Sequence, residues 1–130
     1  MSTLKVNTIQ NTSGGSSSTP EQIEQGRAKA WVHFQGSGTV TKNNDFNVSS
    51  VSDEGTGLYD VNFTTNMSNA NYVTQVNGQL DVTSGSTSTD NVIYSVVNTP
   101  QTTSSTRVFS RAATSSTLDS LNMFVVVFGD

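Results

Sequence analysis

The chain has 130 residues, which is typical of one domain; 59 of them are Ser, Thr, Asn or Gln, only 12% are charged, and the net charge is −4. The absence of cysteine excludes a disulfide scaffold, a thiol nucleophile and a cysteine-based zinc site. No apolar run reaches the roughly 18 residues needed for a membrane-spanning helix, and the acidic balance is the opposite of that of a general nucleic-acid binder.

The chain begins with a segment that is expected to be extended. Residues 3–10 place Leu4 and Val6 on one face and Ile9 on the other. Residues 11–19 follow with the glycine- and serine-rich composition of a flexible linker. No secretory signal precedes them, because the N-terminus lacks a basic stretch followed by an apolar run, so we expect the protein to be made and assembled in a cytoplasm.

A short helix is predicted next. Thr19 is placed as its N-cap, Pro20 as its first residue, and Gln22 three positions after the cap, which is a capping-box arrangement. Gly26 is the stop signal, so the helix spans one or two turns. Residues 1–26 are therefore expected to form an arm, a hinge and a short helix, separate from a body at 27–130.

From residue 28 the hydrophobic pattern changes to period two. Residues 28–34 place Ala28, Ala30, Val32 and Phe34 on one face and Lys29, Trp31 and His33 on the other. Further strand candidates are 39–42, 46–52, 58–64, 71–77, 79–83, 92–98, 106–111 and 121–128. The last of these is apolar on both faces, which predicts a strand that is central or sandwiched between layers or subunits.

The connections between these strands are of hairpin type. Residues 53–57 and the pair Asn77-Gly78 are strong turn signals. Longer polar connections are expected at 84–90, 98–105 and 112–119, and loops on a rigid scaffold commonly carry recognition. Valine, isoleucine and threonine number 38, and ten aromatic residues are spread along the chain, which argues against disorder.

These patterns predict an all-β protein. We expect an antiparallel β-sandwich or barrel-like body with an extended N-terminal arm and one short helix. A chain of this length has a thin core, so association of several copies would share the task of burying apolar surface.

His33 is the single histidine of the chain. A catalytic triad would require it, but Trp31 and Lys29 share its strand face, which favours a surface or subunit-interface role. The alternative is a trimer axis that gathers three copies of His33 around a transition metal. We assign no metal or cofactor to the chain.

The acidic residues do not suggest catalysis. Asp60, Asp81, Asp90 and Asp119 are scattered, and their spacing selects no pair for glycoside hydrolysis. No phosphate-binding glycine loop is present in the sequence. We therefore expect a non-enzymatic protein.

Aromatic and basic side chains offer binding alternatives. Trp31, Tyr59, Tyr72 and Tyr94 would suit a sugar-stacking platform, but their positions in strands favour packing in a core or an interface. Arg107 and Arg111 flank Phe109 on one strand face. This arrangement suits an interface with an acidic or glycan partner, and equally simple solvation.

The N-terminal half carries a family resemblance. It is carried by residues 2–14, by the block 28–34 with Gly36 and 38–40, and by the stretches 46–51, 55–63 and 67–72. Together these segments resemble tail-fibre and related structural proteins of marine tailed phages, including cyanophages. The match covers roughly residues 2–75. From about Val76 onward, the chain is similar only in style.

The resemblance implies a non-enzymatic virion component that is assembled in the host cytoplasm. It implies a homotrimer, an arm that holds other virion proteins through Leu4, Val6 and Ile9, and a β-body that faces a host glycan or protein, with Trp31, His33, Arg107 and Arg111 as candidate receptor or interface residues. Neither nucleic-acid binding nor membrane insertion is expected. The chain is too short for a long fibre shaft, so a short tail fibre or fibre-like appendage is favoured.

Two alternatives stay open. One is a capsid decoration or head-fibre protein that stabilises the shell. The other, which is less favoured, is a polysaccharide-degrading enzyme.

Overall fold

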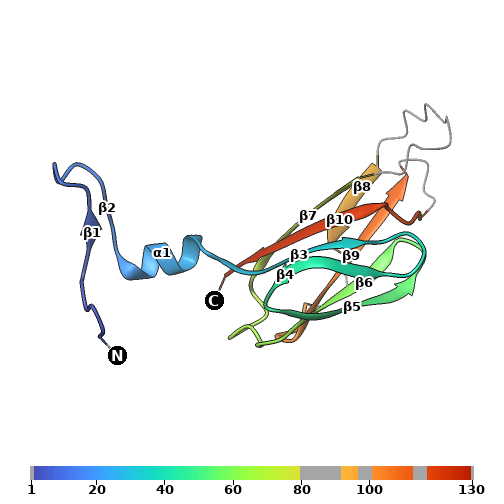
Figure 1. Cartoon of the computed structure of the whole chain (residues 1–130), viewed down its shortest axis with the longest axis horizontal. Helices are drawn as coiled ribbons and strands as arrows, with labels where there is room; N and C mark the ends of the chain where they lie inside the picture. Colours follow the sequence, from blue (N-terminus) through green and yellow to red (C-terminus); the bar gives the residue numbers. More distant parts are fainter. Residues whose placement is uncertain (1, 80–91, 97–100, 113–116, 130) are drawn as a thin grey trace.

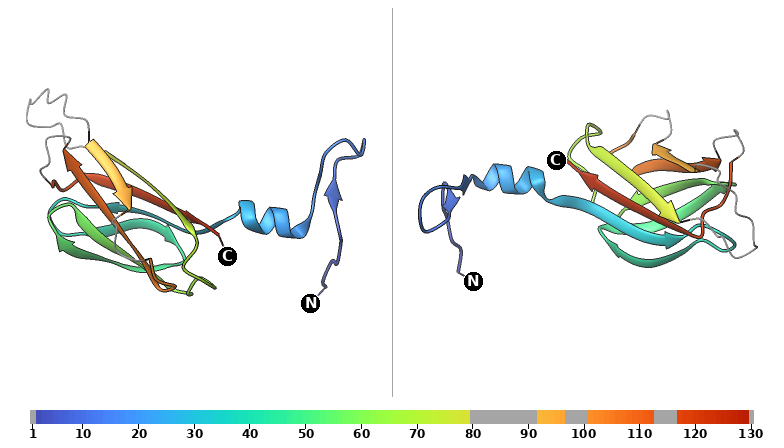
Figure 2. Two further views of the ribbon diagram at one scale, coloured as in Figure 1. Left: turned by 180° about the vertical axis from the view of Figure 1, so that it is seen from behind. Right: turned by 90° about the horizontal axis from the view of Figure 1, so that it is seen from above.

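The computed structural model describes residues 2–79, 92–96, 101–112 and 117–129. The chain is mostly β, with antiparallel sheets packed against each other as a sandwich, which confirms the predicted fold class. An arm projects from one end of this sandwich and carries the N-terminus away from it (Figures 1 and 2).

The arm contains a miniature hairpin and a helix. Strands β1 (Ile9–Gln10) and β2 (Ser17–Ser18) pair antiparallel, and α1 follows at Pro20–Gly26. The turn between the strands is organised by Asn11, whose Oδ1 accepts hydrogen bonds from the Gly15 N–H (2.9 Å) and the Ser13 hydroxyl (3.0 Å). An asparagine side chain can imitate a backbone turn in this way, so part of the expected linker forms a local structure that its composition did not reveal.

The helix begins and ends where its sequence predicts. The Thr19 hydroxyl accepts from the Gln22 N–H (3.2 Å), and the Gln22 side chain accepts from the Thr19 N–H (2.9 Å), which completes the capping box. Glu24 forms ion pairs with Arg27 (2.8 Å) and Lys29, and thereby links the end of the helix to the first strand of the body. The hydrogen bond from Lys29 is the main reason that the pKa of Glu24 lies below its usual value.

We expect Thr19→Ala to unravel α1 without unfolding the body. The helix has seven residues and buries none of them, so local capping has to replace tertiary packing as its support. Loss of the cap costs about 1 kcal/mol. Amide hydrogen exchange at residues 20–26 should therefore rise several-fold, while the thermal unfolding midpoint of the body stays unchanged. Unchanged exchange in the helix would contradict this expectation.

In the described part of the chain, the body has two four-stranded antiparallel sheets. The first has the order β4-β3-β10-β7, formed by β3 (Ala28–Gln35), β4 (Thr41–Phe46), β7 (Val73–Gln79) and β10 (Asn122–Phe128). The second has the order β5-β6-β9-β8, formed by β5 (Val48–Gly55), β6 (Leu58–Phe63), β8 (Val92–Val96) and β9 (Ser105–Ala112).

The core lies between these sheets and follows the predicted alternation. The inner positions of β3, β6 and β10 are buried, as expected for strands with one inward face. Phe34 of β3 meets Tyr59 of β6 edge to face, with ring centroids 5.2 Å apart. The prediction of a central strand is also confirmed, because β10 lies between β3 and β7.

The chain changes sheets at Asn47, between β4 and β5. Its backbone is left-handed (φ 56°), a conformation that asparagine tolerates better than most residues. Its side chain accepts from the Thr65 N–H (2.7 Å) and donates to the carbonyl oxygens of Lys29 (3.0 Å) and Thr65 (3.1 Å). These bonds connect the first strand of the body to the loop after β6.

The turn predicted at Asn77-Gly78 is wrong, because both residues lie inside β7. A Cβ at position 78 would stand 2.6 Å from Cζ of Tyr94 and 2.8 Å from the Asn122 carbonyl oxygen. Glycine is therefore used here for the close approach of a ring from the opposite sheet. Of the strand expected at 79–83, residue 79 belongs to β7, and 80–83 lie outside the described residues.

The boundaries expected at 39–42 and 46–52 are also corrected, since β4 spans Thr41–Phe46 and β5 spans Val48–Gly55. Asparagine and aspartate disfavour strands, but β4 is an edge strand held by β3, with a register shift beside His33 that accommodates the extra residue. Some predicted segments lie outside the described residues. They are the loop at 84–90, and residues 97–100 and 113–116 of the strand and connections expected there.

Candidate functional site

The outer side of the first sheet carries exposed aromatic residues. Because outward positions alternate with core positions, β3 presents Trp31 and His33, and β10 presents Phe124 and Val126. The strand register sets Trp31 opposite both Phe46 of β4 and Val126, and it sets His33 opposite Phe124. These five side chains, Trp31, His33, Phe46, Phe124 and Val126, are called the aromatic face below.

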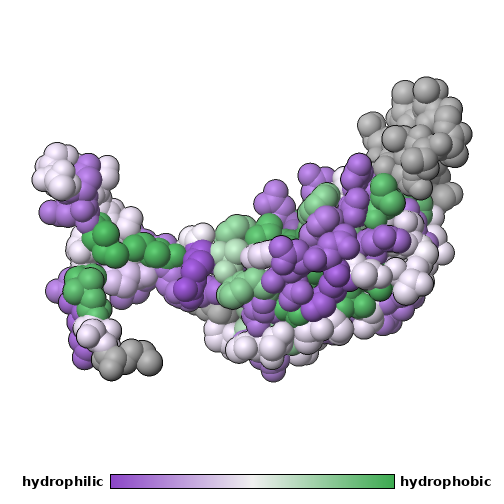
Figure 3. Space-filling view, viewed as in Figure 1, coloured by the Kyte–Doolittle hydropathy of each residue, from purple (hydrophilic) through white to green (hydrophobic). Residues whose placement is uncertain are grey.

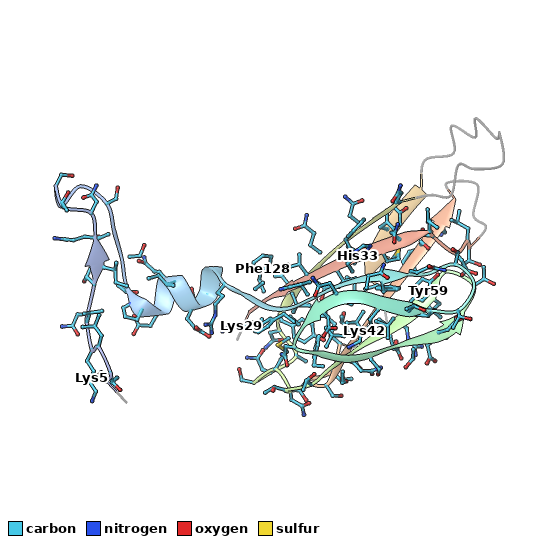
Figure 4. All side chains as sticks on the ribbon, in the orientation of Figure 1. Lys5, Lys29, His33, Lys42, Tyr59 and Phe128 are labelled. Carbon is cyan, nitrogen blue, oxygen red and sulfur yellow. The ribbon has the colours of Figure 1, made fainter. Side chains whose placement is uncertain are left out.

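The ring of His33 is held in place on this face. It stacks on Phe124 with centroids 4.7 Å apart and an interplanar angle of 27°. Its Nε2 lies 3.0 Å from Oδ1 of Asn122 and 3.2 Å from Nδ2 of Asn43. When Nε2 is protonated it donates to Asn122, and when it is unprotonated it accepts from Asn43. The partners of the histidine are thus amides and an aromatic ring. Figure 4 labels His33 on the sandwich.

A shallow hollow of about 430 Å³ lies over the aromatic face. Its lining combines apolar side chains with amides, and comprises Trp31, Val32, His33, Gln75, Asn77, Phe124, Val125 and Val126. None of these residues is an acid, a lysine or an arginine. The hollow is therefore an amphipathic surface with no fixed charge.

The outer side of the second sheet differs in character. Arg107 donates two hydrogen bonds to the Asp60 carboxylate (2.5 and 2.6 Å) and one to Glu54 (3.1 Å), so its charge is already balanced. Arg111 lies over the ring of Phe109, 5.7 Å from its centroid. The two arginines do share one strand face, but Arg107 is occupied within the chain.

The other candidate acids and tyrosines support the fold. Asp119 accepts from the Gly57 N–H (2.6 Å) and the Tyr59 hydroxyl (3.1 Å), and that hydroxyl also donates to the Gly36 carbonyl oxygen (2.9 Å). Burial, assisted by Asp119, raises the pKa of Tyr59, so the hydroxyl remains a donor. Tyr72 is also buried, and its hydroxyl donates to the carbonyl oxygen of Ser105 (2.7 Å). Positions 81 and 90 lie outside the described residues.

These contacts decide between the alternatives for the aromatic residues. Tyr59 and Tyr72 are 0% and 5% exposed and serve the core, so they are unavailable for sugar stacking. Tyr94 packs against the core. Trp31 alone of the four lies on an outer face. Sequence reasoning missed Phe46 and Phe124, although each occupies the outward phase of its strand.

A second apolar surface lies on the arm. Leu4, Val6 and Ile9 are 84%, 38% and 54% exposed, and Ile23 of α1 is 45% exposed. All four line one groove of about 630 Å³, together with Lys5, Asn7, Pro20 and Glu21. This set is called the arm groove below. Figure 3 shows hydrophobic residues gathered at the surface of the arm.

The arm groove corrects the expected placement of the apolar side chains on the arm. Leu4 and Val6 were expected on one face and Ile9 on the other, but the fold brings all three to one groove. Ile23 was missed; the signal that could have found it is an isolated large apolar residue in an otherwise polar, short helix.

No protein-family model matches the chain, and no curated protein or solved structure matches it. Within the described residues there is no group of three or more His, Asp or Glu side chains that could hold a metal ion. The same part of the chain has no helix long and apolar enough to span a bilayer.

Proposed function

We propose that the chain is a non-enzymatic structural component of a tailed-phage particle, a short tail fibre or fibre-like appendage that attaches by its N-terminal arm and displays its β-body toward the host. The resemblance implies three copies as the working unit, and linked copies raise avidity without adding new contacts. The proposal combines the resemblance of residues 2–75 with the geometry of the arm.

The proposed attachment role rests on one observation, the exposure of the apolar side chains that line the arm groove. Large apolar side chains that project beyond a folded body gain free energy when a partner covers them, about 1.5–3 kcal/mol for each fully buried side chain. Leu4, Ile9 and Ile23 have this exposure. The arm that carries them lies apart from the sandwich (Figure 1). A virion protein that covers the groove is the partner that the proposal requires.

The test is incorporation into particles. The gene for this chain would be deleted from the phage that encodes it. The deleted phage would be complemented with either the natural protein or the double variant Leu4→Ser/Ile9→Ser. Loss of two buried apolar contacts should weaken attachment about a hundredfold or more. Purified particles should then contain little of the variant, as measured by quantitative immunoblotting.

The matched control is Val73→Ser, which alters an equally exposed apolar residue of the body (65% exposed). It should be incorporated normally, and circular dichroism should show both variants folded. Normal incorporation of the arm variant would refute the attachment role. A labelled antibody against the chain should decorate the tail; labelling spread over the capsid would instead support the decoration-protein alternative.

A further inference from the structure

The fold leaves a specific group of aromatic side chains outside the core. Phe46 and Phe124 are 51% and 43% exposed, and Trp31 and His33 are half-buried beside them. They form neighbouring cross-strand pairs on β4, β3 and β10, so their rings make one continuous patch. Stacking and the amide contacts already hold His33 in a fixed orientation, which reduces the entropy cost of binding a ligand there.

Amide side chains surround this patch. Asn44 is opposite His33, Asn77 is opposite Phe124, and Gln75 is opposite Val126. All three are exposed. Each amide has two donor hydrogens and an acceptor oxygen. The Oδ1 atoms of Asn44 and Asn77 already accept from the N–H groups of Asp45 (3.0 Å) and Gly78 (2.8 Å), so Gln75 provides the acceptor that is not used in this way. The patch therefore has apolar rings at its centre and hydrogen-bonding groups of both kinds at its rim.

The charge of the site narrows the class of ligand. The residues that line the hollow include no acid, lysine or arginine, and His33 is their one ionisable side chain. The hollow therefore has no permanent positive charge to pair with a phosphate, a carboxylate or a nucleic-acid backbone. The opposite outer face, by contrast, carries the Asp60–Arg107–Glu54 cluster. A ligand that suits the aromatic face is neutral, has an apolar side to lie on a ring, and has hydroxyl groups for the amides.

A second copy of the chain fits this surface less well. Packing two aromatic faces together would bury the rim amides of both copies, and each buried amide would then have to meet an amide of the other copy in hydrogen-bonding geometry. Saccharide hydroxyls can donate and accept, so they satisfy the amides directly.

We propose that the aromatic face binds a neutral saccharide, whose ring lies against Trp31 and Phe124 while its hydroxyls pair with the amides of Asn44, Gln75 and Asn77. The proposal concerns the body alone, and it stands whether or not the arm attaches to a virion. Failure of the particle-incorporation test would leave it intact, and its own failure would leave the attachment role intact.

The chain contains its own reporter for this test. Trp31 is the only tryptophan, so its fluorescence reports events on the aromatic face. The full chain would be titrated with a panel of neutral oligosaccharides (maltohexaose, cellohexaose, xylohexaose and mannohexaose) and with an anionic hexagalacturonate. We expect a saturable change in emission with at least one neutral member, and a weaker response or none with the anionic one.

Variants then locate the site. Phe124→Ala should weaken binding about tenfold or more, as expected for an aromatic residue at the centre of a contact. Phe109→Ala alters a ring on the outer face of the second sheet and should leave binding unchanged. Both would be checked by circular dichroism and by isothermal titration calorimetry, which does not depend on tryptophan.

Three results would overturn the proposal. The first is the absence of a saturable response to every neutral oligosaccharide up to about 10 mM, a concentration that reveals even millimolar affinities. The second is equal weakening by Phe109→Ala. The third is sedimentation showing that Phe124→Ala breaks an oligomer of the natural chain while no saccharide binds, which would make the aromatic face an interface between copies.

Discussion

Phe34→Ala is expected to lower the free energy of unfolding of the body by about 3–5 kcal/mol. Phe34 is fully buried on the inner side of β3, and its ring packs edge to face on Tyr59 of the opposite sheet. Alanine would lose the transfer free energy of the ring and leave a cavity between the sheets. Total stabilities are commonly about 5–15 kcal/mol, and this core is thin, so the variant should be close to unfolding at 37 °C.

Urea denaturation followed by circular dichroism measures the effect. Phe46→Ala is the matched control, because it removes the same side chain from a site that is 51% exposed on the neighbouring strand. We expect the control to lose less than about 1 kcal/mol, in keeping with most surface substitutions. Equal losses in the two variants would show that the body is not organised around the interface between its sheets.

Gly57→Ala is expected to cost about 2–5 kcal/mol, from left-handed strain of about 1–2 kcal/mol and overpacking of about 1–3 kcal/mol. Gly57 has φ +68°, and a Cβ there would be 2.6 Å from the Leu118 carbonyl oxygen and would also clash with the Ser110 carbonyl oxygen. Both obstacles are backbone atoms, so no side chain can simply turn aside. The shift would also disturb the hydrogen bond from Gly57 to Asp119.

Gly38→Ala separates the two contributions. Gly38 has nearly the same backbone angle (φ +70°), but a Cβ there would have no neighbour within 4 Å. Its replacement should therefore cost only the strain of about 1–2 kcal/mol. Thermal unfolding of both variants, compared with the natural chain, measures the difference. If the two losses are equal, the close approach at Gly57 does not contribute to stability.

The two proposed roles fall on separate regions of the chain. The arm groove is formed by residues that lie near one another in the sequence or on the adjacent helix. The aromatic face instead needs β3 and β10, the first and last strands in the sequence of the body, which lie side by side (Figure 2). Arm variants should therefore lower particle incorporation without changing saccharide binding, and Phe124→Ala should do the reverse. A chain that carries both changes should show each loss at the size seen in the single variant.

The sequence by itself determined the local structure. The capping box of α1 joins Thr19 to Gln22, three positions away, so its signal is complete within one turn of chain. The alternation in β3 and β6 likewise determined which side chains face inward, because successive side chains of a strand point to opposite sides. The expectation that β10 is central followed from its apolar residues on both faces.

Only the tertiary structure decided which distant residues meet. The sequence alone predicts a turn at Gly78. In the structure, the ring of Tyr94 from the other sheet fills the space that a side chain at this position would need. His33 contacts Asn122 and Phe124 because β3 pairs with β10, which lies about 90 positions further along the chain. Arg107 contacts Asp60 because β9 pairs with β6. Periodicity states the face on which a side chain lies, but it contains no information about which strand lies beside it, since strand order and register depend on the packing of the whole sandwich.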